Sequence, residues 1–150
     1  MLLFAAMKTP IFHLAFPIRD VPSTVAFYRD QLGLRIDLIE AQRCIIDFFG
    51  HQVVAHVSEK DVPARVAMYP RHFGLILDDE KQYDDFHKKV EKAGVAFFER
   101  LFVRFEGTPR EHKTFFLKDP SNNLIELKWY RDPSLIFKSH PQSPSLDKKH

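Results

Sequence analysis

An internal repeat constrains the fold of this 150-residue chain more than any other feature of its sequence. Two segments match at a histidine, an aspartate and a phenylalanine, and the two members of each matched pair are 59 residues apart. The pairs are His13 with His72, Asp20 with Asp79, and Phe27 with Phe86. Each segment is typical of a strand, an acidic helix N-cap, an amphipathic helix and a glycine that ends the helix.

Three β-like runs follow the predicted helix in each half of the chain. They cover residues 34–40, 43–49 and 52–58 in the first half and residues 95–103, 113–117 and 123–129 in the second. The pattern is therefore βαβββ, twice. It predicts an α+β protein in which two βαβββ modules form a curved, eight-stranded mixed sheet around a metal-binding cup.

The same pattern predicts the organisation of the chain as one compact domain. We expect an N-terminal extension at 1–10, a first module at 11–58 and a linker at 59–70 that carries Pro63 and Pro70. The second module follows at 71–133. A proline- and serine-containing tail at 134–150 completes the chain.

Composition excludes several classes of function. The net charge of +2 is too small to indicate binding to nucleic acid or to an acidic membrane. No run of residues approaches the roughly 20 apolar residues that a membrane helix needs. A single cysteine, Cys44, cannot form a disulfide within the chain, so we expect a reducing, cytoplasmic setting and a cysteine packed in the core.

The two repeated histidines are predicted to share one chemical environment. Side chains alternate between the faces of a strand, so His13 lies opposite the large apolar residues of its strand, and His72 does the same. Glu126 lies in the middle of the last predicted strand, between apolar neighbours. A buried carboxylate needs an ionic partner or a metal ion. Two histidines and one carboxylate form the facial triad that non-haem Fe(II) favours, although ion pairing of Glu126 with Lys128 or Arg131 is the structural alternative.

Other residues are candidates for supporting roles in the predicted site. Counted from the preceding turn, His56 corresponds to Glu126 in the repeat, so it is a further candidate ligand or proton shuttle. His112 precedes a strand and is a candidate acid–base group. The candidate pocket residues are four aromatic side chains for an apolar wall and two arginines for an anionic substrate: Phe48, Phe49, Phe115 and Phe116, with Arg71 and Arg104.

Paired βαβββ modules with these histidines and this glutamate resemble the vicinal-oxygen-chelate superfamily over residues 11–134. That group includes glyoxalase I, bleomycin-resistance proteins, fosfomycin-resistance enzymes and type I extradiol dioxygenases. Segments 47–56, 70–74 and 105–133 look similar to a bacterial subfamily of predicted extradiol dioxygenases. The resemblance implies that His13, His72 and Glu126 are the metal ligands. Phe116 stands where the extradiol signature has a tyrosine.

The resemblance implies a non-haem metal-dependent dioxygenase, with Fe(II) as the expected metal and Zn(II), Ni(II) or Mn(II) as alternatives. Its partners would be O₂ and a small, aromatic substrate with vicinal oxygens, and the superfamily implies a homodimer. A glyoxalase-type lyase or isomerase is the first alternative, with His56 at the place of glyoxalase I's fourth ligand. A metal-free protein that binds a drug-like molecule is the second.

Overall fold

The computed structural model describes residues 9–138, so residues 1–8 of the predicted extension and 139–150 of the predicted tail lie outside the described part. The first four-stranded sheet has the order β1-β4-β3-β2 and the second has the order β5-β8-β7-β6. The elements of the first module are β1 (His13–Ile18), α1 (Val21–Val25), η1 (Ala26–Gln31), β2 (Arg35–Ile39), β3 (Arg43–Phe48) and β4 (His51–Val57). Those that follow are η2 (Glu59–Asp61), β5 (Phe73–Leu77), α2 (Glu80–Lys92), β6 (Phe97–Arg104), β7 (His112–Lys118), β8 (Leu124–Tyr130) and η3 (Pro133–Leu135).

Both predicted helix starts are present. The carboxylate of Asp20 accepts a hydrogen bond from the backbone N–H of Ser23 at 2.7 Å, and Asp79 accepts one from Gln82 at 3.0 Å. The first helix begins as α1 and continues as the π-helical η1. No helix among residues 9–138 is long and apolar enough to cross a membrane.

The eight strands form two sheets rather than the single eight-stranded sheet that the sequence predicts. Within the described residues, every strand pairing joins strands of the same module. In each sheet the first strand of the module pairs in parallel with the last, and the remaining pairs are antiparallel. No strand of one module therefore pairs with a strand of the other among the described residues, and the modules meet through side chains.

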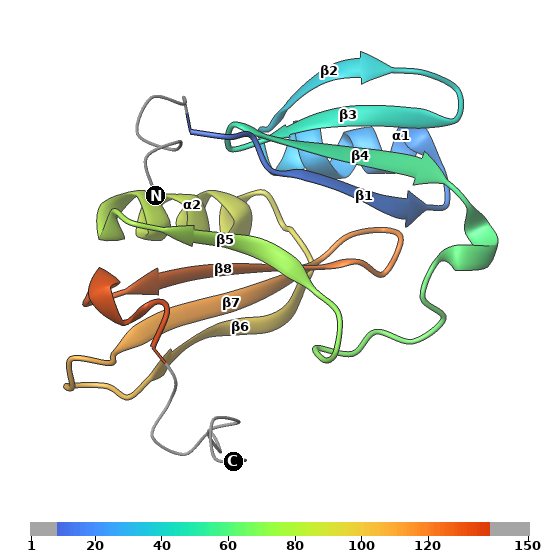
Figure 1. Ribbon diagram of the computed structural model, residues 1–150. Helices are drawn as coiled ribbons and strands as arrows, with labels where there is room; N and C mark the ends of the chain where they lie inside the picture. The colour runs from blue at the N-terminus through green and yellow to red at the C-terminus, as the bar shows by residue number, and fades with distance from the viewer. Residues whose placement is uncertain (1–8, 139–150) are drawn as a thin grey trace, which may run out of the picture.

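Aromatic side chains make much of the contact between the modules. The ring of Phe73 lies 5.4 Å from that of Phe16 and 5.7 Å from that of Phe48, and Phe49 packs 5.4 Å from Phe86 of α2. Figure 1 shows the first sheet, with α1 behind it, above the second sheet, with α2 on the side that faces the first module. One apolar core therefore runs through both modules, and Cys44 is buried in it as expected.

Polar contacts also join the modules. The buried hydroxyl of Tyr28 donates a hydrogen bond to the carboxylate of Asp119 at 3.0 Å, and the side-chain amide of Asn123 donates to the carbonyl oxygen of Pro17 at 3.1 Å. Asp119 and Asn123, which make these contacts from the second module, lie in the turn that leads into β8. These contacts fix the start of β8, and hence Glu126, relative to the first module.

Candidate metal centre

His72 and Glu126 form the centre of the candidate site. Glu126 lies within β8, and its neighbour across the parallel pair is Gly74 of β5, two residues after His72. The Nε2 atom of His72 is 3.0 Å from Oε2 of Glu126, and the two side chains are 21% and 12% exposed. The pair is thus largely shielded from water but accessible to a small ligand.

The imidazole of His72 is oriented by the backbone of the linker. Its Nδ1 atom is 2.6 Å from the carbonyl oxygen of Met68. Because a carbonyl oxygen can only accept, Nδ1 must carry the proton and donate it. If the imidazole is neutral, Nε2 carries a lone pair, and so does the carboxylate oxygen that faces it. Two such atoms repel each other at this distance unless a positive charge lies between them. That charge is either a second proton on the imidazole or a metal ion bound by both atoms.

The other oxygen of the Glu126 carboxylate is held by two donors. Thr114 of β7 donates a hydrogen bond from Oγ1 to Oε1 at 2.7 Å, and Nζ of Lys128 lies 3.5 Å from the same oxygen. The contact with Lys128 is the ion pair that the sequence offered as the structural alternative for Glu126. Because both donors use Oε1, Oε2 remains directed at His72. Oriented ligands of this kind are typical of metal sites.

A glycine lets the two strands approach at this point. A Cβ atom placed on Gly74 would overlap with the backbone carbonyl oxygen of Glu126. The overlap is with backbone, which cannot rotate away as a long side chain could. Gly74 therefore sets the separation of β5 from β8 beside the His72–Glu126 pair.

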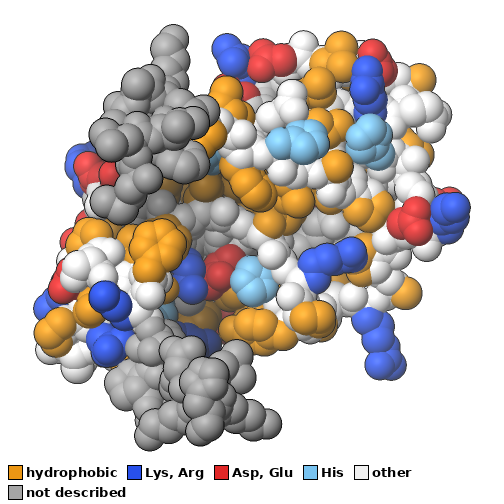
Figure 2. All heavy atoms as spheres, in the orientation of Figure 1, with side chains coloured by type: hydrophobic (Ala, Val, Ile, Leu, Met, Phe, Trp, Pro, Cys, Tyr) orange, Lys and Arg blue, Asp and Glu red, His pale blue; other side chains and the backbone are white. Residues whose placement is uncertain are grey.

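His13 is not close enough to complete a triad within the chain. Among residues 9–138, the structure holds no group of three histidine, cysteine, aspartate or glutamate side chains that could bind one metal ion. His13 is exposed on β1, where its Nδ1 is 2.8 Å from the side-chain oxygen of Gln52. In the tautomer that donates from Nδ1 to this oxygen, Nε2 is the atom available as a ligand. Figure 2 shows histidine side chains at the surface of both modules on this face.

The strand register contradicts the predicted correspondence of His56 with Glu126. In the first sheet His13 is opposite Gln52 and Ala15 is opposite Val54, so Val54 holds the position that Glu126 holds in the second sheet. His56 is opposite Pro17 and corresponds to Lys128 instead. Counting from the turn was wrong because the turn before β4 is shorter than the one before β8. His56 is exposed and lies four residues along β4 from the neighbour of His13.

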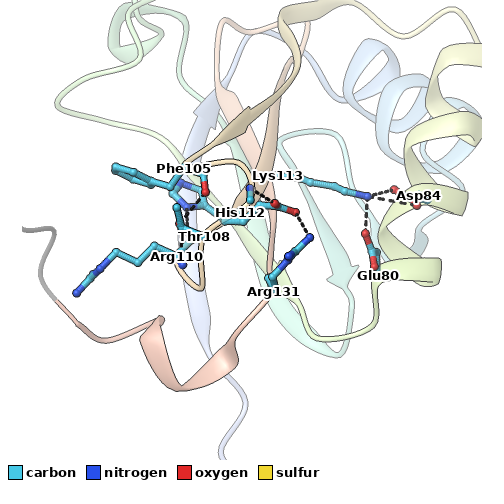
Figure 3. Close-up of polar contacts among 10 residues, drawn as sticks. Glu80, Asp84, Phe105, Thr108, Arg110, His112, Lys113 and Arg131 are labelled. Atoms are coloured by element: carbon cyan, nitrogen blue, oxygen red, sulfur yellow. Dashed lines mark hydrogen bonds and ion pairs between the residues drawn. The ribbon is translucent and has the colours of Figure 1, made fainter.

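His112 is on the same face of the second sheet as Glu126 but at a distance from it. It pairs with Tyr130, four residues along β8 from Glu126, which corresponds to about 13 Å of strand. Its buried ring stacks on Tyr130 with the ring centroids 4.8 Å apart. Figure 3 shows His112 beside Phe105, whereas Lys113 extends the opposite way towards α2. The structure thus does not bring His112 to the His72–Glu126 pair.

The predicted pocket residues divide into three groups. Phe116 packs against His72 with the rings 5.2 Å apart, and Arg71 lines a cavity that also includes His72. Arg104 lies elsewhere, with its guanidinium over the ring of Phe102. Three predicted wall residues instead pack in the apolar core between sheets and helices: Phe48, Phe49 and Phe115. They were assigned wrongly because the sequence does not show how the modules meet.

Sequence reasoning missed three groups that the structure places around the pair. Thr114 holds Glu126, the carbonyl oxygen of Met68 holds His72, and Arg65 lines the same cavity as His72. Thr114 could have been found, because alternation along its strand puts it on the same face as Phe116. A backbone carbonyl such as that of Met68 leaves no signal in the sequence.

Comparison with known proteins identifies a family. The model of the Glyoxalase/Bleomycin resistance protein/Dioxygenase superfamily matches residues 11–127. The crystal structure of a glyoxalase/bleomycin resistance protein/dioxygenase from Alicyclobacillus acidocaldarius is 42% identical to this chain. It superimposes with a TM-score of 0.82 over 87% of this chain and 100% of its own.

The chain also matches more distant proteins. The metallothiol transferase FosB of Staphylococcus saprophyticus is 22% identical over 121 residues, which are 81% of this chain and 77% of the relative. A variant of the fosfomycin resistance protein FosX from Listeria monocytogenes was solved with Mn(II) and 1S,2S-dihydroxypropylphosphonic acid. It is 16% identical, with a TM-score of 0.60 over 81% of this chain and 90% of its own.

Proposed function

Because the chain belongs to the Glyoxalase/Bleomycin resistance protein/Dioxygenase superfamily, we propose that it is a metal-dependent dioxygenase. It binds a divalent ion, Fe(II) in this proposal, through His72, Glu126 and His13. Its substrate is a small, aromatic molecule with vicinal oxygens. The observation that carries the proposal is the 3.0 Å contact between Nε2 of His72 and Oε2 of Glu126, two atoms of the kind that bind divalent metals.

The donor set fits such an ion. Two imidazole nitrogens and one carboxylate oxygen are the ligands that Fe(II) dioxygenases use, and they also suit Mn(II), Zn(II) and Ni(II). Members of the superfamily bind divalent metals such as Mn(II). The ion would supply Lewis-acid binding of two neighbouring substrate oxygens and, as Fe(II), electrons for reaction with O₂.

Residues of the chain prepare this site. The Met68 carbonyl keeps the proton of His72 on Nδ1, which frees Nε2 to act as a ligand. Thr114 keeps Oε2 of Glu126 directed at the same place. Phe116, which is buried beside His72, excludes water from one side of the pair. Lys128 provides a positive charge at 3.5 Å from Glu126 that limits the net negative charge of the site.

The third ligand, His13, is supplied by a second copy of the chain in this proposal. His13 presents a free lone pair on Nε2 from an exposed position on β1. The His72–Glu126 pair in turn lacks a third ligand among residues 9–138. A homodimer that places β1 of each copy over β8 of the other would complete two equivalent sites, as expected for a symmetric dimer.

The register of the first sheet favours a three-ligand centre over a glyoxalase-type lyase. A lyase of that type uses a fourth protein ligand in the first module. Val54, which has no donor atom, holds the position equivalent to Glu126, and His56 lies two residues beyond it. A metal-free binding protein would have no need for the oriented pair of His72 and Glu126.

Metal analysis of the purified protein tests the proposal. We expect about one Fe per chain in wild type after anaerobic loading, loss of it in His72→Ala and retention in His56→Ala, measured by inductively coupled plasma mass spectrometry. Oxygen uptake with a panel of catechols should follow the iron content. Stoichiometric metal without oxygen uptake would favour the lyase, and no metal above background would leave the binding protein.

Mixing two inactive variants tests the shared site. A dimer of one His13→Ala chain and one His72→Ala chain contains one complete site if ligands come from both copies. Free exchange makes about half of the dimers mixed, and each mixed dimer holds one complete site out of two, so metal binding should return to about a quarter of the wild-type level. If all three ligands belonged to one chain, mixing would restore no metal binding.

A further inference from the structure

A cavity of about 480 Å³ lies beside the His72–Glu126 pair, at the junction of the two modules. Its volume is in the range that accommodates a small organic ligand. Residues of β1, the linker and the start of β8 line it, together with His72 itself. His72 is therefore shared by the cavity and by the candidate metal centre.

Two arginines give the cavity its charge. Arg65 and Arg71, which both lie between η2 and β5, line it, and no described residue that lines it is acidic. The ion pairs among residues 9–138 include neither arginine. Two guanidinium groups near one cavity, without carboxylate partners, favour an anion with several oxygen acceptors.

Apolar side chains form much of the remaining wall. Leu14 and Phe16 come from β1, Phe73 from β5 and Leu124 from β8. This combination does not suit a free inorganic ion, which has no apolar part to bury. It suits a molecule with an oxyanion group at one end and a hydrocarbon body.

The segment that carries the arginines is anchored near both. The side-chain amide of Asn122 donates a hydrogen bond to the carbonyl oxygen of Pro63 at 2.9 Å, two residues before Arg65. Further along, Met68 accepts the 2.6 Å hydrogen bond from His72, three residues before Arg71. The cavity wall is thus fixed to the same histidine that the proposed metal site uses.

We propose that this cavity binds a small organic anion, a carboxylate or phosphonate on an apolar body, through Arg65 and Arg71. If this anion is the substrate, its anionic end lies at the arginines and its reacting oxygens lie at His72 and Glu126, and this assignment rests on the proposed function. Binding of the anion itself depends on the cavity alone.

Calorimetric titration of the chelator-treated, metal-free protein tests the binding. The probes are phenylacetate, benzylphosphonate and the neutral amide phenylacetamide. We expect the two anions to bind at least about tenfold more tightly than the amide, since hydrogen bonds to charged groups are the stronger ones. Tighter binding of phenylacetate or of benzylphosphonate identifies which oxyanion the cavity prefers. The anion affinities should fall as salt is raised, because both arginines are exposed.

Matched variants separate the arginines from general charge. Arg65→Gln and Arg71→Gln should each weaken anion binding by about tenfold. Arg100→Gln removes an arginine of β6 that contacts Glu91 away from the cavity, so it should leave anion binding unchanged. Any of three results would overturn the inference. They are equal affinities for phenylacetate and phenylacetamide, no binding of any probe, and anion binding that neither Arg65→Gln nor Arg71→Gln weakens.

Metal content, measured on a portion of each preparation that has been loaded with metal instead of treated with chelator, keeps the two proposals apart. The arginine variants should retain wild-type metal content, because neither arginine is a proposed ligand. If wild type bound no stoichiometric metal, the proposed function would fail, and the arginine dependence of anion binding would still decide the inference by itself.

Discussion

Gly74 and Glu126 face one another across the parallel pair of β5 and β8, so closely that a Cβ on Gly74 would overlap with the Glu126 carbonyl oxygen. His72 lies two residues before this contact. The backbone approach at Gly74 therefore sets where the carboxylate of Glu126 lies relative to the imidazole of His72. A position that carries no functional group thus controls the geometry of the candidate site.

Gly74→Ala should separate β5 from β8 and move His72 away from Glu126. Overpacking of this kind costs about 1–3 kcal/mol of unfolding free energy, and we expect a loss of metal binding beyond that. Denaturant unfolding and metal analysis measure the two effects. Gly107→Ala is the control: space around Gly107 is open although its φ is +75°, so it should lose stability only and keep the metal. Retention of full metal affinity in Gly74→Ala would contradict the proposed control of geometry.

Thr114→Val removes a hydroxyl without changing the size of the side chain. Oε1 of Glu126 loses its 2.7 Å hydrogen bond, so the carboxylate can rotate away from His72. Loss of such a supporting hydrogen bond weakens metal binding by about 10- to 100-fold. Competition with a chromogenic chelator measures the affinity. Thr108→Val, which removes a hydroxyl that forms hydrogen bonds with Phe105 and Arg110 of its own loop, should leave the metal affinity at the wild-type level.

Tyr28→Phe tests the polar contact between the modules. The Tyr28 hydroxyl is buried and donates to Asp119 at 3.0 Å, so its removal should reduce the unfolding free energy by about 1 kcal/mol. Burial, followed by the nearby Asp119 charge, raises the pKa of Tyr28. Burial also raises the pKa of Tyr83, so spectroscopic titration should show two tyrosines fewer ionising near pH 10 in the folded protein than in the unfolded one, and Tyr28→Phe should reduce this difference to one. Tyr69→Phe, at an exposed position, should alter neither result.

The sequence predicted the elements well because their signals are local. The acidic caps at Asp20 and Asp79 and the alternation of apolar residues depend only on neighbouring positions, and each produced an element close to its expected bounds. The pairing of His72 with Glu126 was also predictable. Glu126 lies in β8 and His72 immediately precedes β5, and the βαβββ pattern makes these two strands neighbours in one sheet.

The remainder of the site depends on long-range packing that the sequence does not show. Whether His13 reaches Glu126 depends on how two separate sheets are placed, and here contacts such as that between Phe16 and Phe73 decide it. The position of His56 depends on the register between β1 and β4. This register could not be counted from the sequence, because the turns before β4 and β8 differ in length. Arg65 lies in a segment that the sequence marks only as a linker.

Asp119→Asn should produce a pH-dependent loss of stability. The Asp119 carboxylate accepts four hydrogen bonds, from Tyr28, from the backbone of Ser121 and from both the backbone and the side chain of Asn123. The side-chain NH₂ group of an asparagine would face at least one of these hydrogen-bond donors, which would then lose its acceptor. The expected loss of unfolding free energy is about 1–3 kcal/mol. Burial raises the pKa of Asp119 above its usual 3.8, although the hydrogen bonds act in the opposite direction.

The sign of the pH dependence follows from that raised pKa. Between pH 3.8 and the folded-state pKa, the folded chain holds a proton on Asp119 that the unfolded chain releases, so rising pH removes stability. The asparagine has no such titration, and all other groups are common to both proteins. The difference in unfolding free energy between wild type and Asp119→Asn should therefore be largest near pH 4 and shrink towards pH 7. Urea unfolding at several pH values measures it, and a difference that grew with pH would show that the four hydrogen bonds outweigh burial.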